Sequence, residues 1–106
     1  MADPSTHARD ALYLALSSVP TGRLISYGDL AELAGLPGRA RWVGRQLSQL
    51  PASSRLPWHR VLKANGRLAF EPGTEAYRRQ LSKLQKEGAA DDGGHIDWRG
   101  CRWPDK

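Results

Sequence analysis

Apolar residues recur at helical spacing at the start of the chain. They predict a helix over about residues 6–18, which ends where Pro20-Thr21-Gly22 supplies the chemistry of a turn. The residues at this spacing are Ala8, Leu12, Ala15, Leu16 and Val19.

Two shorter helices are predicted to follow. Ser26 is a favourable N-cap with Asp29 three residues later, and Gly35 can form a left-handed stop, so we expect a helix over about residues 27–34. A second apolar stripe predicts a helix over about residues 40–50. Its members are Ala40, Val43, Gly44 and Leu47. Two short helices joined by a tight turn, the second of them rich in arginine, are typical of a helix-turn-helix.

A hairpin is predicted after these helices. The Asn65-Gly66 pair lies between two short β-prone runs within residues 61–70, which is a strong local signal for a two-residue hairpin turn. The expected fold is therefore mainly α, a winged-helix-like helix-turn-helix DNA-binding domain with a short β-hairpin as its wing.

The end of the chain combines one more helix with a tail. Thr74 can cap a helix over about residues 75–87, whose inward residues are Tyr77, Leu81 and Leu84. A glycine-rich segment then separates a body of about residues 6–88 from a tail over residues 89–106. Because the tail carries Ile96, Trp98 and Trp103, we expect it to fold back onto the body with little regular structure. The whole chain, residues 1–106, is predicted to form a single domain.

Composition adds a preference for a polyanionic partner. Sixteen Lys and Arg residues stand against eleven Asp and Glu in 106 residues, a net charge of +5. This balance favours nucleic acid, although charge alone also allows a lipid surface. On the helix over residues 40–50, Arg41, Arg45 and Ser48 share a stripe away from the apolar face. This stripe is either a DNA-binding face or an ordinary solvated face.

Several kinds of chemistry are not indicated. The single cysteine, Cys101, allows no internal disulfide and no multi-thiolate zinc site. His7, His59 and His95 show no metal-ligand spacing with it, so neither a metal nor another cofactor is expected. No apolar run approaches the roughly 20 residues of a membrane span, and the N-terminus lacks the order of a signal peptide. We therefore expect a cytoplasmic protein.

The segment Leu56-Pro57-Trp58-His59-Arg60-Val61 resembles the Pro-Cys-His-Arg-Val motif of the O6-alkylguanine-DNA alkyltransferases. The resemblance extends over about residues 7–88. Further matching segments, in the order of that family, are Ser26-Tyr27-Gly28, Ala40-Arg41, Val43-Gly44 and Glu87-Gly88. With Trp58 in place of the cysteine, the chain is similar to the alkyltransferase-like proteins, the branch that transfers no alkyl group.

The chemistry of the substituted residue supports the same interpretation. Direct dealkylation needs a soft nucleophile, such as a thiolate activated by a neighbouring histidine. The indole of Trp58 offers no such nucleophile and instead adds bulk and an aromatic surface. His59 and Glu87 match the family's activating relay, so the resemblance implies a vestigial relay with a structural role and no catalytic residue.

The resemblance also implies roles for residues that would bind DNA in the minor groove. Tyr27 matches the residue that crowds the 3′ phosphate and promotes rotation of the nucleotide, and Arg41 matches the finger that fills the vacated stack. The expected lesion pocket consists of Tyr27, Trp58, Val61 and Leu68, with the loop over residues 68–72 as one wall. Residues expected to contact the DNA are Tyr27, Arg39, Arg41, Arg45 and Lys63.

The function implied by the resemblance is that of a non-enzymatic DNA damage sensor. It would flip O6-alkylguanine out of duplex DNA without alkyl transfer and pass the site to nucleotide excision repair proteins, acting as a monomer in the cytoplasm in association with the nucleoid. Three other interpretations stay open. The chain could be a sequence-specific winged-helix regulator, it could be a residual alkyltransferase that uses Cys101, or Trp58 could be an ordinary core residue.

Overall fold

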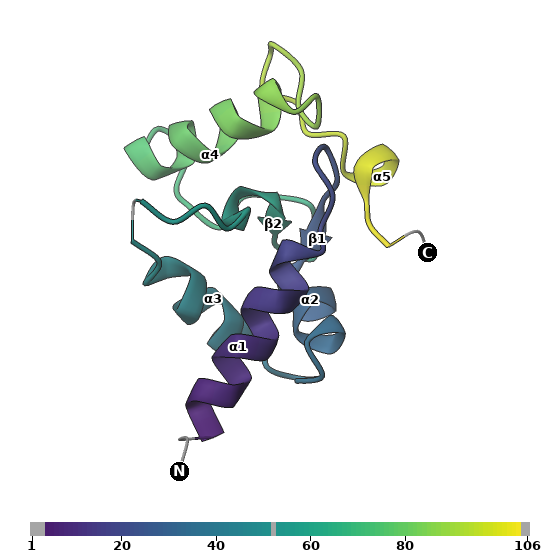
Figure 1. Ribbon diagram of the computed structural model, residues 1–106. Helices are drawn as coiled ribbons and strands as arrows, with labels where there is room; N and C mark the ends of the chain where they lie inside the picture. The colour runs from purple at the N-terminus through teal and green to yellow at the C-terminus, as the bar shows by residue number, and fades with distance from the viewer. Residues whose placement is uncertain (1–3, 52, 105–106) are drawn as a thin grey trace.

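Helices are the main regular elements of the computed structural model, which describes residues 4–51 and 53–104 (Figure 1). The α-helices are α1 (Pro4–Ser17), α2 (Tyr27–Leu33), α3 (Ala40–Ser48), α4 (Glu75–Lys86) and α5 (Trp98–Cys101). The other elements are the strands β1 (Ile25–Ser26) and β2 (Val61–Leu62) and the 3₁₀ helix η1 (Trp58–Arg60). The predicted mainly helical fold is confirmed. Within the described ranges, no helix has both the length and the apolar character needed to cross a bilayer.

The capping residues predicted from the sequence start the helices that they were expected to start. The Ser26 hydroxyl accepts a hydrogen bond from the backbone N–H of Asp29 at 3.0 Å, and the Thr74 hydroxyl accepts one from the N–H of Tyr77 at 3.2 Å. Each bond satisfies an amide that the first helical turn leaves without an intrahelical acceptor. The Asp29 carboxylate accepts a hydrogen bond from Arg102 in the tail at 3.1 Å.

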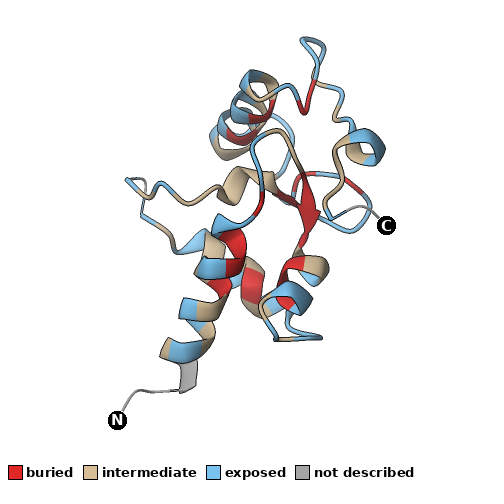
Figure 2. Ribbon diagram, turned by 45° about the vertical axis from the view of Figure 1, so that its right-hand side comes forward, coloured by how far each residue is buried: buried red, intermediate tan, exposed pale blue. Residues whose placement is uncertain are grey.

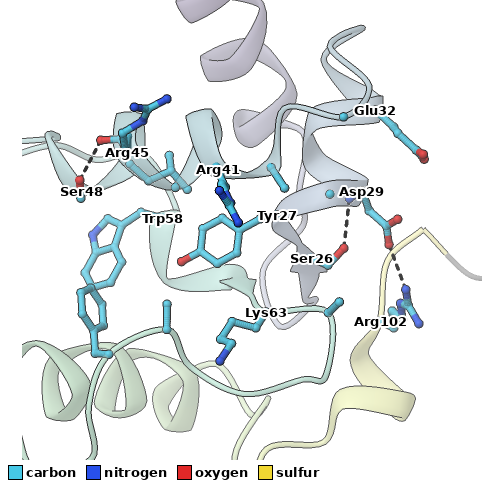
Figure 3. A pocket seen from close by; sticks show the side chains of 18 residues that line it. Ser26, Tyr27, Asp29, Glu32, Arg41, Arg45, Ser48, Trp58, Lys63 and Arg102 are labelled. Atoms are coloured by element: carbon cyan, nitrogen blue, oxygen red, sulfur yellow. Dashed lines mark hydrogen bonds and ion pairs between the residues drawn. The ribbon is translucent and has the colours of Figure 1, made fainter.

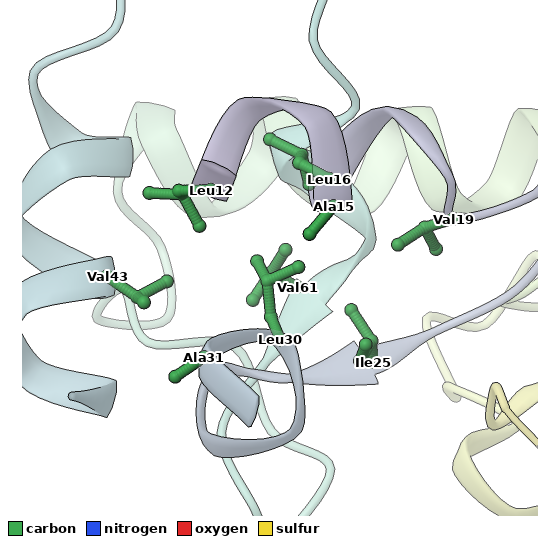
Figure 4. Packing of buried hydrophobic residues seen from close by; sticks show 9 residues of the cluster. All are labelled: Leu12, Ala15, Leu16, Val19, Ile25, Leu30, Ala31, Val43 and Val61. Atoms are coloured by element: carbon green, nitrogen blue, oxygen red, sulfur yellow. The ribbon is translucent and has the colours of Figure 1, made fainter. Parts of the chain in front are cut away.

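A first hydrophobic cluster joins α1 to the helix-turn-helix (Figure 4). Every member is at most 6% exposed, and the two helices of the motif, α2 and α3, are connected by residues 34–39. The predicted helix-turn-helix is therefore present and rests on the inward face of α1. The members of the first cluster are Leu12, Ala15, Leu16, Val19, Ile25, Leu30, Ala31, Val43 and Val61.

The predicted β-hairpin wing is wrong. β2 pairs with β1, in parallel and with Ile25 opposite Val61, so no antiparallel wing forms in the described residues. Asn65-Gly66 does form a turn, closed by a hydrogen bond from the N–H of Lys63 to the carbonyl of Arg67 at 2.9 Å. After this turn the chain does not pair with β2, because Leu68 packs into a second cluster instead. Both residues of β2 are buried, which is typical of a strand inside a parallel pair.

This second hydrophobic cluster lies between α4, the sheet and the C-terminal tail (Figure 2). Its buried members are Leu24, Leu62, Leu68, Leu84, Ala89 and Ala90, with Ile96 and Trp98 packed against them. The predicted return of the tail to the body is therefore confirmed. The prediction of little regular structure in the tail is wrong at one point, because the Asp97 carboxylate accepts the N–H of Gly100 at 3.0 Å and caps the short helix α5.

The contact between Trp98 and the turn at Gly66 leads to a stability prediction. Gly66 has φ +81°, and a Cβ there would lie 2.6 Å from Cγ of Trp98, whereas Gly73 has φ +89° with open space around it. We expect Gly73→Ala to lower the free energy of unfolding by about 1 kcal/mol, from backbone strain alone. Gly66→Ala should cost about 2–4 kcal/mol, because overpacking adds to that strain. Urea denaturation measures both values. Equal losses of unfolding free energy in the two variants would show that Trp98 moves away from the added methyl group at no energetic cost.

Candidate nucleic-acid interface

An open groove of about 1170 Å³ runs along the outer side of the helix-turn-helix (Figure 3). One wall is formed by α2 and α3, and the other by Trp58 of η1 together with the segment over residues 63–70. The side chain of Arg102, from the tail, also lines it. Five of the residues predicted to bind the lesion or DNA lie in this groove, although they are far apart in sequence. They are Tyr27, Arg41, Arg45, Trp58 and Lys63.

The structure does not bring the other predicted site residues into the groove. The side chain of Val61 is fully buried in the first cluster, and that of Leu68 is 7% exposed in the second cluster. The backbone N–H of Val61 donates to the carbonyl of Trp58, and its carbonyl accepts from Gln80. Arg39 is exposed at the N-cap of α3, outside the groove lining.

Trp58 lies on the groove wall at the first position of η1, and it belongs to neither hydrophobic cluster. Its ring makes edge contacts with Phe70, at 6.3 Å between centroids and an interplanar angle of 84°, and with His59 at 6.1 Å and 88°. These two perpendicular ring contacts hold the indole in place, and both Trp58 and Phe70 line the groove. Phe70 is therefore a groove residue that was expected only as part of a loop wall.

Tyr27 begins α2 and extends its ring across the groove, with the hydroxyl directed toward Trp58 (Figure 3). A Cβ at Gly44 would lie 3.9 Å from Cε1 of Tyr27, so the ring rests directly against α3. Burial raises the pKa of Tyr27. The phenol therefore stays protonated at neutral pH and can donate a hydrogen bond to an anion or to a base edge.

The α3 side of the groove is basic, whereas the α2 side includes acidic residues. Arg41 and Arg45 are exposed one helical turn apart, so both can contact the same ligand. Asp29 and Glu32 of α2 also line the groove. The Asp29 carboxylate is paired with Arg102, at 3.1 Å between Oδ2 and Nη2. This pairing offsets a negative charge that would otherwise oppose a polyanion.

Glu87, at the C-cap of α4, organises a partly buried hydrogen-bond network next to η1. Its carboxylate accepts hydrogen bonds from Arg60 at 2.9 and 2.7 Å, from His59 Nε2 at 2.8 Å and from the N–H of Gly22 at 3.3 Å. Arg60 also donates to the carbonyl of Val19 at 2.8 Å. The network therefore joins η1 to the ends of α1 and α4.

The protonation states in this network suit a structural role. Burial alone would raise the pKa of Glu87, but the hydrogen bonds from Arg60, His59 and Gly22 lower it from 4.5 to about 2. Burial lowers the pKa of His59, and the hydrogen bond to Glu87 opposes this only in part. At neutral pH a neutral imidazole therefore donates its Nε2–H to an ionised carboxylate.

Two polar residues that support the site were not singled out from the sequence. Arg60 is predicted only as part of the motif, although its guanidinium makes two hydrogen bonds to Glu87. Gln80 is 1% exposed on the inward face of α4, where its side-chain amide donates to the carbonyls of His59 and Val61 at 3.0 and 3.1 Å. The sequence signal for this role of Gln80 is a glutamine between Tyr77 and Leu84 on an otherwise apolar helix face.

Across the described residues, no three His, Cys, Asp or Glu side chains gather as a metal site requires.

Comparison with known sequences identifies relatives of this chain. Residues 7–89 match the family described as "6-O-methylguanine DNA methyltransferase, DNA binding domain". A "DNA base-flipping protein" of Vibrio parahaemolyticus is 37% identical over 93 residues, which cover 87% of this chain and 91% of that protein. "Alkyltransferase-like protein 1" of Schizosaccharomyces pombe is 32% identical over 77 residues, covering 73% and 71%. A "Methylated-DNA--protein-cysteine methyltransferase" of Mycobacterium bovis is 36% identical over 87 residues, covering 82% of this chain and 53% of the enzyme.

Solved structures show the same fold. The crystal structure of S. pombe Atl1 in complex with damaged DNA containing O6-carboxymethylguanine superposes with a TM-score of 0.80 at 25% identity. The match covers 96% of this chain and 98% of that one. The Mycobacterium tuberculosis OGT structure in complex with DNA has a TM-score of 0.66 at 31% identity, covering 81% and 51%.

The low pKa of Glu87 predicts how stability depends on pH. Since the pKa is about 2 in the folded protein against 4.5 ordinarily, the ionised carboxylate stabilises the fold above about pH 4.5, and this contribution is lost as the pH falls toward 2. Glu87→Gln should lower the free energy of unfolding by about 2 kcal/mol at neutral pH, with a difference from wild type that shrinks on acidification.

Urea denaturation of both proteins between about pH 6 and pH 2 measures this difference. Glu71→Gln, which removes an exposed carboxylate, controls for the loss of one negative charge. A difference between wild type and Glu87→Gln that is constant over the whole range would contradict the assigned role of Glu87.

Proposed function

Because this chain belongs to the 6-O-methylguanine DNA methyltransferase DNA-binding-domain family, we propose that it is a non-enzymatic sensor of O6-alkylguanine in duplex DNA. It binds the duplex, turns the alkylated nucleotide into the groove beside Trp58, and transfers no alkyl group. The observation that carries this proposal is an indole on the groove wall, at the position where the motif of the alkyltransferases has a reactive cysteine.

The groove residues support binding without reaction. Trp58 has no nucleophilic lone pair, and the His59 imidazole donates to Glu87, whose carboxylate is also occupied by Arg60. Cys101 lies in α5 and does not line the groove. Burial and the neighbouring Asp97 raise the pKa of the Cys101 thiol, which keeps it from being a ready nucleophile.

The DNA contacts follow from the charges and shapes along the groove. Arg41 is exposed on α3 and is long enough to fill the space left by an extruded nucleotide, with donors for the orphaned base. Tyr27 crowds the 3′ phosphate and favours rotation. Arg45 and Lys63, together with Arg39 at the N-cap of α3, contact phosphates and give affinity that falls as salt rises. The recognition helix α3 enters the minor groove, as the resemblance implies.

Preference for the lesion comes from two energetic terms. Alkylation at O6 removes the N1 proton of guanine and weakens its pairing with cytosine, so extrusion costs less than the few kcal/mol of an intact pair. The alkyl group then contacts the aromatic wall formed by Trp58 and Phe70, which are 6.3 Å apart at their ring centroids. Each buried CH₂ contributes about 0.8 kcal/mol.

A sensor that cannot repair its target must transfer it to another pathway. We propose that the monomeric complex on nucleoid DNA is recognised by nucleotide excision repair proteins, as the resemblance implies. A bound, distorted duplex with an extruded nucleotide presents the unpaired structure that such a pathway would require.

The decisive test compares two duplexes of identical sequence, one with guanine and one with O6-methylguanine. Wild type should bind the modified duplex more tightly, and Tyr27→Ala and Arg41→Ala should each reduce the affinity for it about tenfold, equivalent to about 1.4 kcal/mol. Arg79→Ala, an exposed arginine of α4 outside the groove, is the charge-matched control and should change affinity about twofold or less. Equal affinity for both duplexes, with dependence on flanking sequence, would support a winged-helix regulator instead.

Intact-mass spectrometry tests the absence of transfer. After incubation with excess methylated duplex, the mass of the protein should be unchanged, since the groove holds no thiolate. A gain of one CH₂ unit, absent in Cys101→Ser, would assign residual alkyltransferase activity to Cys101 and overturn the non-enzymatic proposal.

A further inference from the structure

The C-terminal tail is attached to the edge of the sheet beside the groove. The N–H of Leu24 donates to the carbonyl of Cys101 at 2.8 Å, and the N–H of Trp103 donates to the carbonyl of Leu24 at 2.7 Å. These bonds place Arg102 opposite Leu24 in a parallel bridge, directly before β1. The backbone of Arg102 is therefore held as firmly as a strand residue, although the surrounding segment contains only a short helix.

The side chain of Arg102 is held at the α2 end of the groove. Its Nη2 pairs with Asp29 Oδ2 at 3.1 Å, and its Cζ lies 4.9 Å from the ring centroid of Trp98. The side chain is 36% exposed and lines the same groove as Tyr27 and Arg41. In Figure 3, Arg102 and Arg45 lie toward opposite ends of the groove.

The guanidinium retains unused hydrogen-bonding capacity. Among the described residues its ion pair is made through Nη2, whereas the Nε–H is buried and has no acceptor, so only a movement of the side chain would bring that donor to a ligand in the groove. A guanidinium presents five donors in a planar fork that matches phosphate oxygens. Arg102 pairs with Asp29 through one nitrogen only, at the edge of an open groove. The guanidinium can therefore exchange the carboxylate for a phosphate and remain paired throughout.

We propose that Arg102 is a DNA-backbone contact supplied by the tail: when DNA occupies the groove, the guanidinium leaves Asp29 and binds a phosphate oxygen of the strand beside α2. This inference rests on the proposed function, because it requires DNA in the groove. It extends the interface beyond residue 89, where the family match ends. In the absence of DNA, the ion pair with Asp29 holds the Arg102 side chain in position and weakens its binding of other anions.

A simpler role would be to neutralise Asp29, and a double-variant comparison separates the two. If Arg102 only neutralises Asp29, then Asp29→Asn makes the arginine dispensable, and Asp29→Asn and Asp29→Asn/Arg102→Gln bind DNA equally. If Arg102 binds a phosphate, the double variant stays weaker than Asp29→Asn. The double variant also contains no unpaired carboxylate, so it is expected to keep the fold, and thermal denaturation verifies this.

The experiment measures the affinity of each protein for the O6-methylguanine duplex over a range of salt concentrations. We expect Asp29→Asn to bind more tightly than wild type, and the double variant to bind about three- to tenfold more weakly than Asp29→Asn. The slope of log affinity against log salt should be shallower by about 0.9 in the double variant, the value for one phosphate contact. Asp29→Asn/Arg99→Gln removes an exposed charge from the same tail and should keep the slope of Asp29→Asn.

The possible results are distinguishable from failure of the proposed function. Equal affinities and slopes for Asp29→Asn and the double variant, with wild type still preferring the modified duplex, would overturn the tail contact alone. A slope change of the same size in the Arg99 control would also overturn it, because the effect would then be one of overall charge. Absence of any preference by wild type would overturn the lesion-sensing proposal, and absence of any DNA binding by wild type would overturn both proposals.

Discussion

The ionised carboxylate of Glu87 is the interaction on which the arrangement of the groove depends. It lies at the end of α4, yet it binds Arg60 and His59 from η1 and the backbone of the turn after α1. Charge-assisted hydrogen bonds of this kind are roughly twice as strong as neutral ones, and here they connect segments separated by as many as 65 residues. Because η1 is a single short turn, its position comes from these contacts rather than from its own helical stability.

The hydrogen bonds to Glu87 determine which role the His59 side chain beside Trp58 can have. In a relay, a histidine must accept a proton from a nucleophile on one side while a carboxylate orients it on the other. Here the ring of His59 lies perpendicular to that of Trp58, and its Nε2–H donates to a carboxylate that Arg60 also binds. The arrangement suits rigidity, and the residue next to His59 in the motif is an indole and not a thiol. A wall of fixed aromatic rings is well suited to bind a flat, uncharged ligand.

The groove carries both basic residues, which attract a polyanion, and acidic residues, which repel it. The exposed arginines of α3 suit attraction of a polyanion, but Asp29 in the first turn of α2 lines the same groove. Arg102 compensates that charge from a segment near the other end of the chain. The tail is thus part of the electrostatic surface of the site, and not merely a cover for the second cluster.

Local sequence signals predicted the positions of the main helices and the loss of the reactive residue. Helical spacing and the caps at Ser26 and Thr74 predicted the main helices, because these depend on neighbours within one or two turns. The indole in the motif predicted the loss of a nucleophile, because reactivity is a property of the residue itself. Tertiary structure alone decided the parallel pairing of β2, the burial of Val61 and Leu68 away from the groove, and the arrival of Arg102 within it. Each of these outcomes depends on which distant segments compete for one buried surface or one charge, and no local pattern encodes that competition.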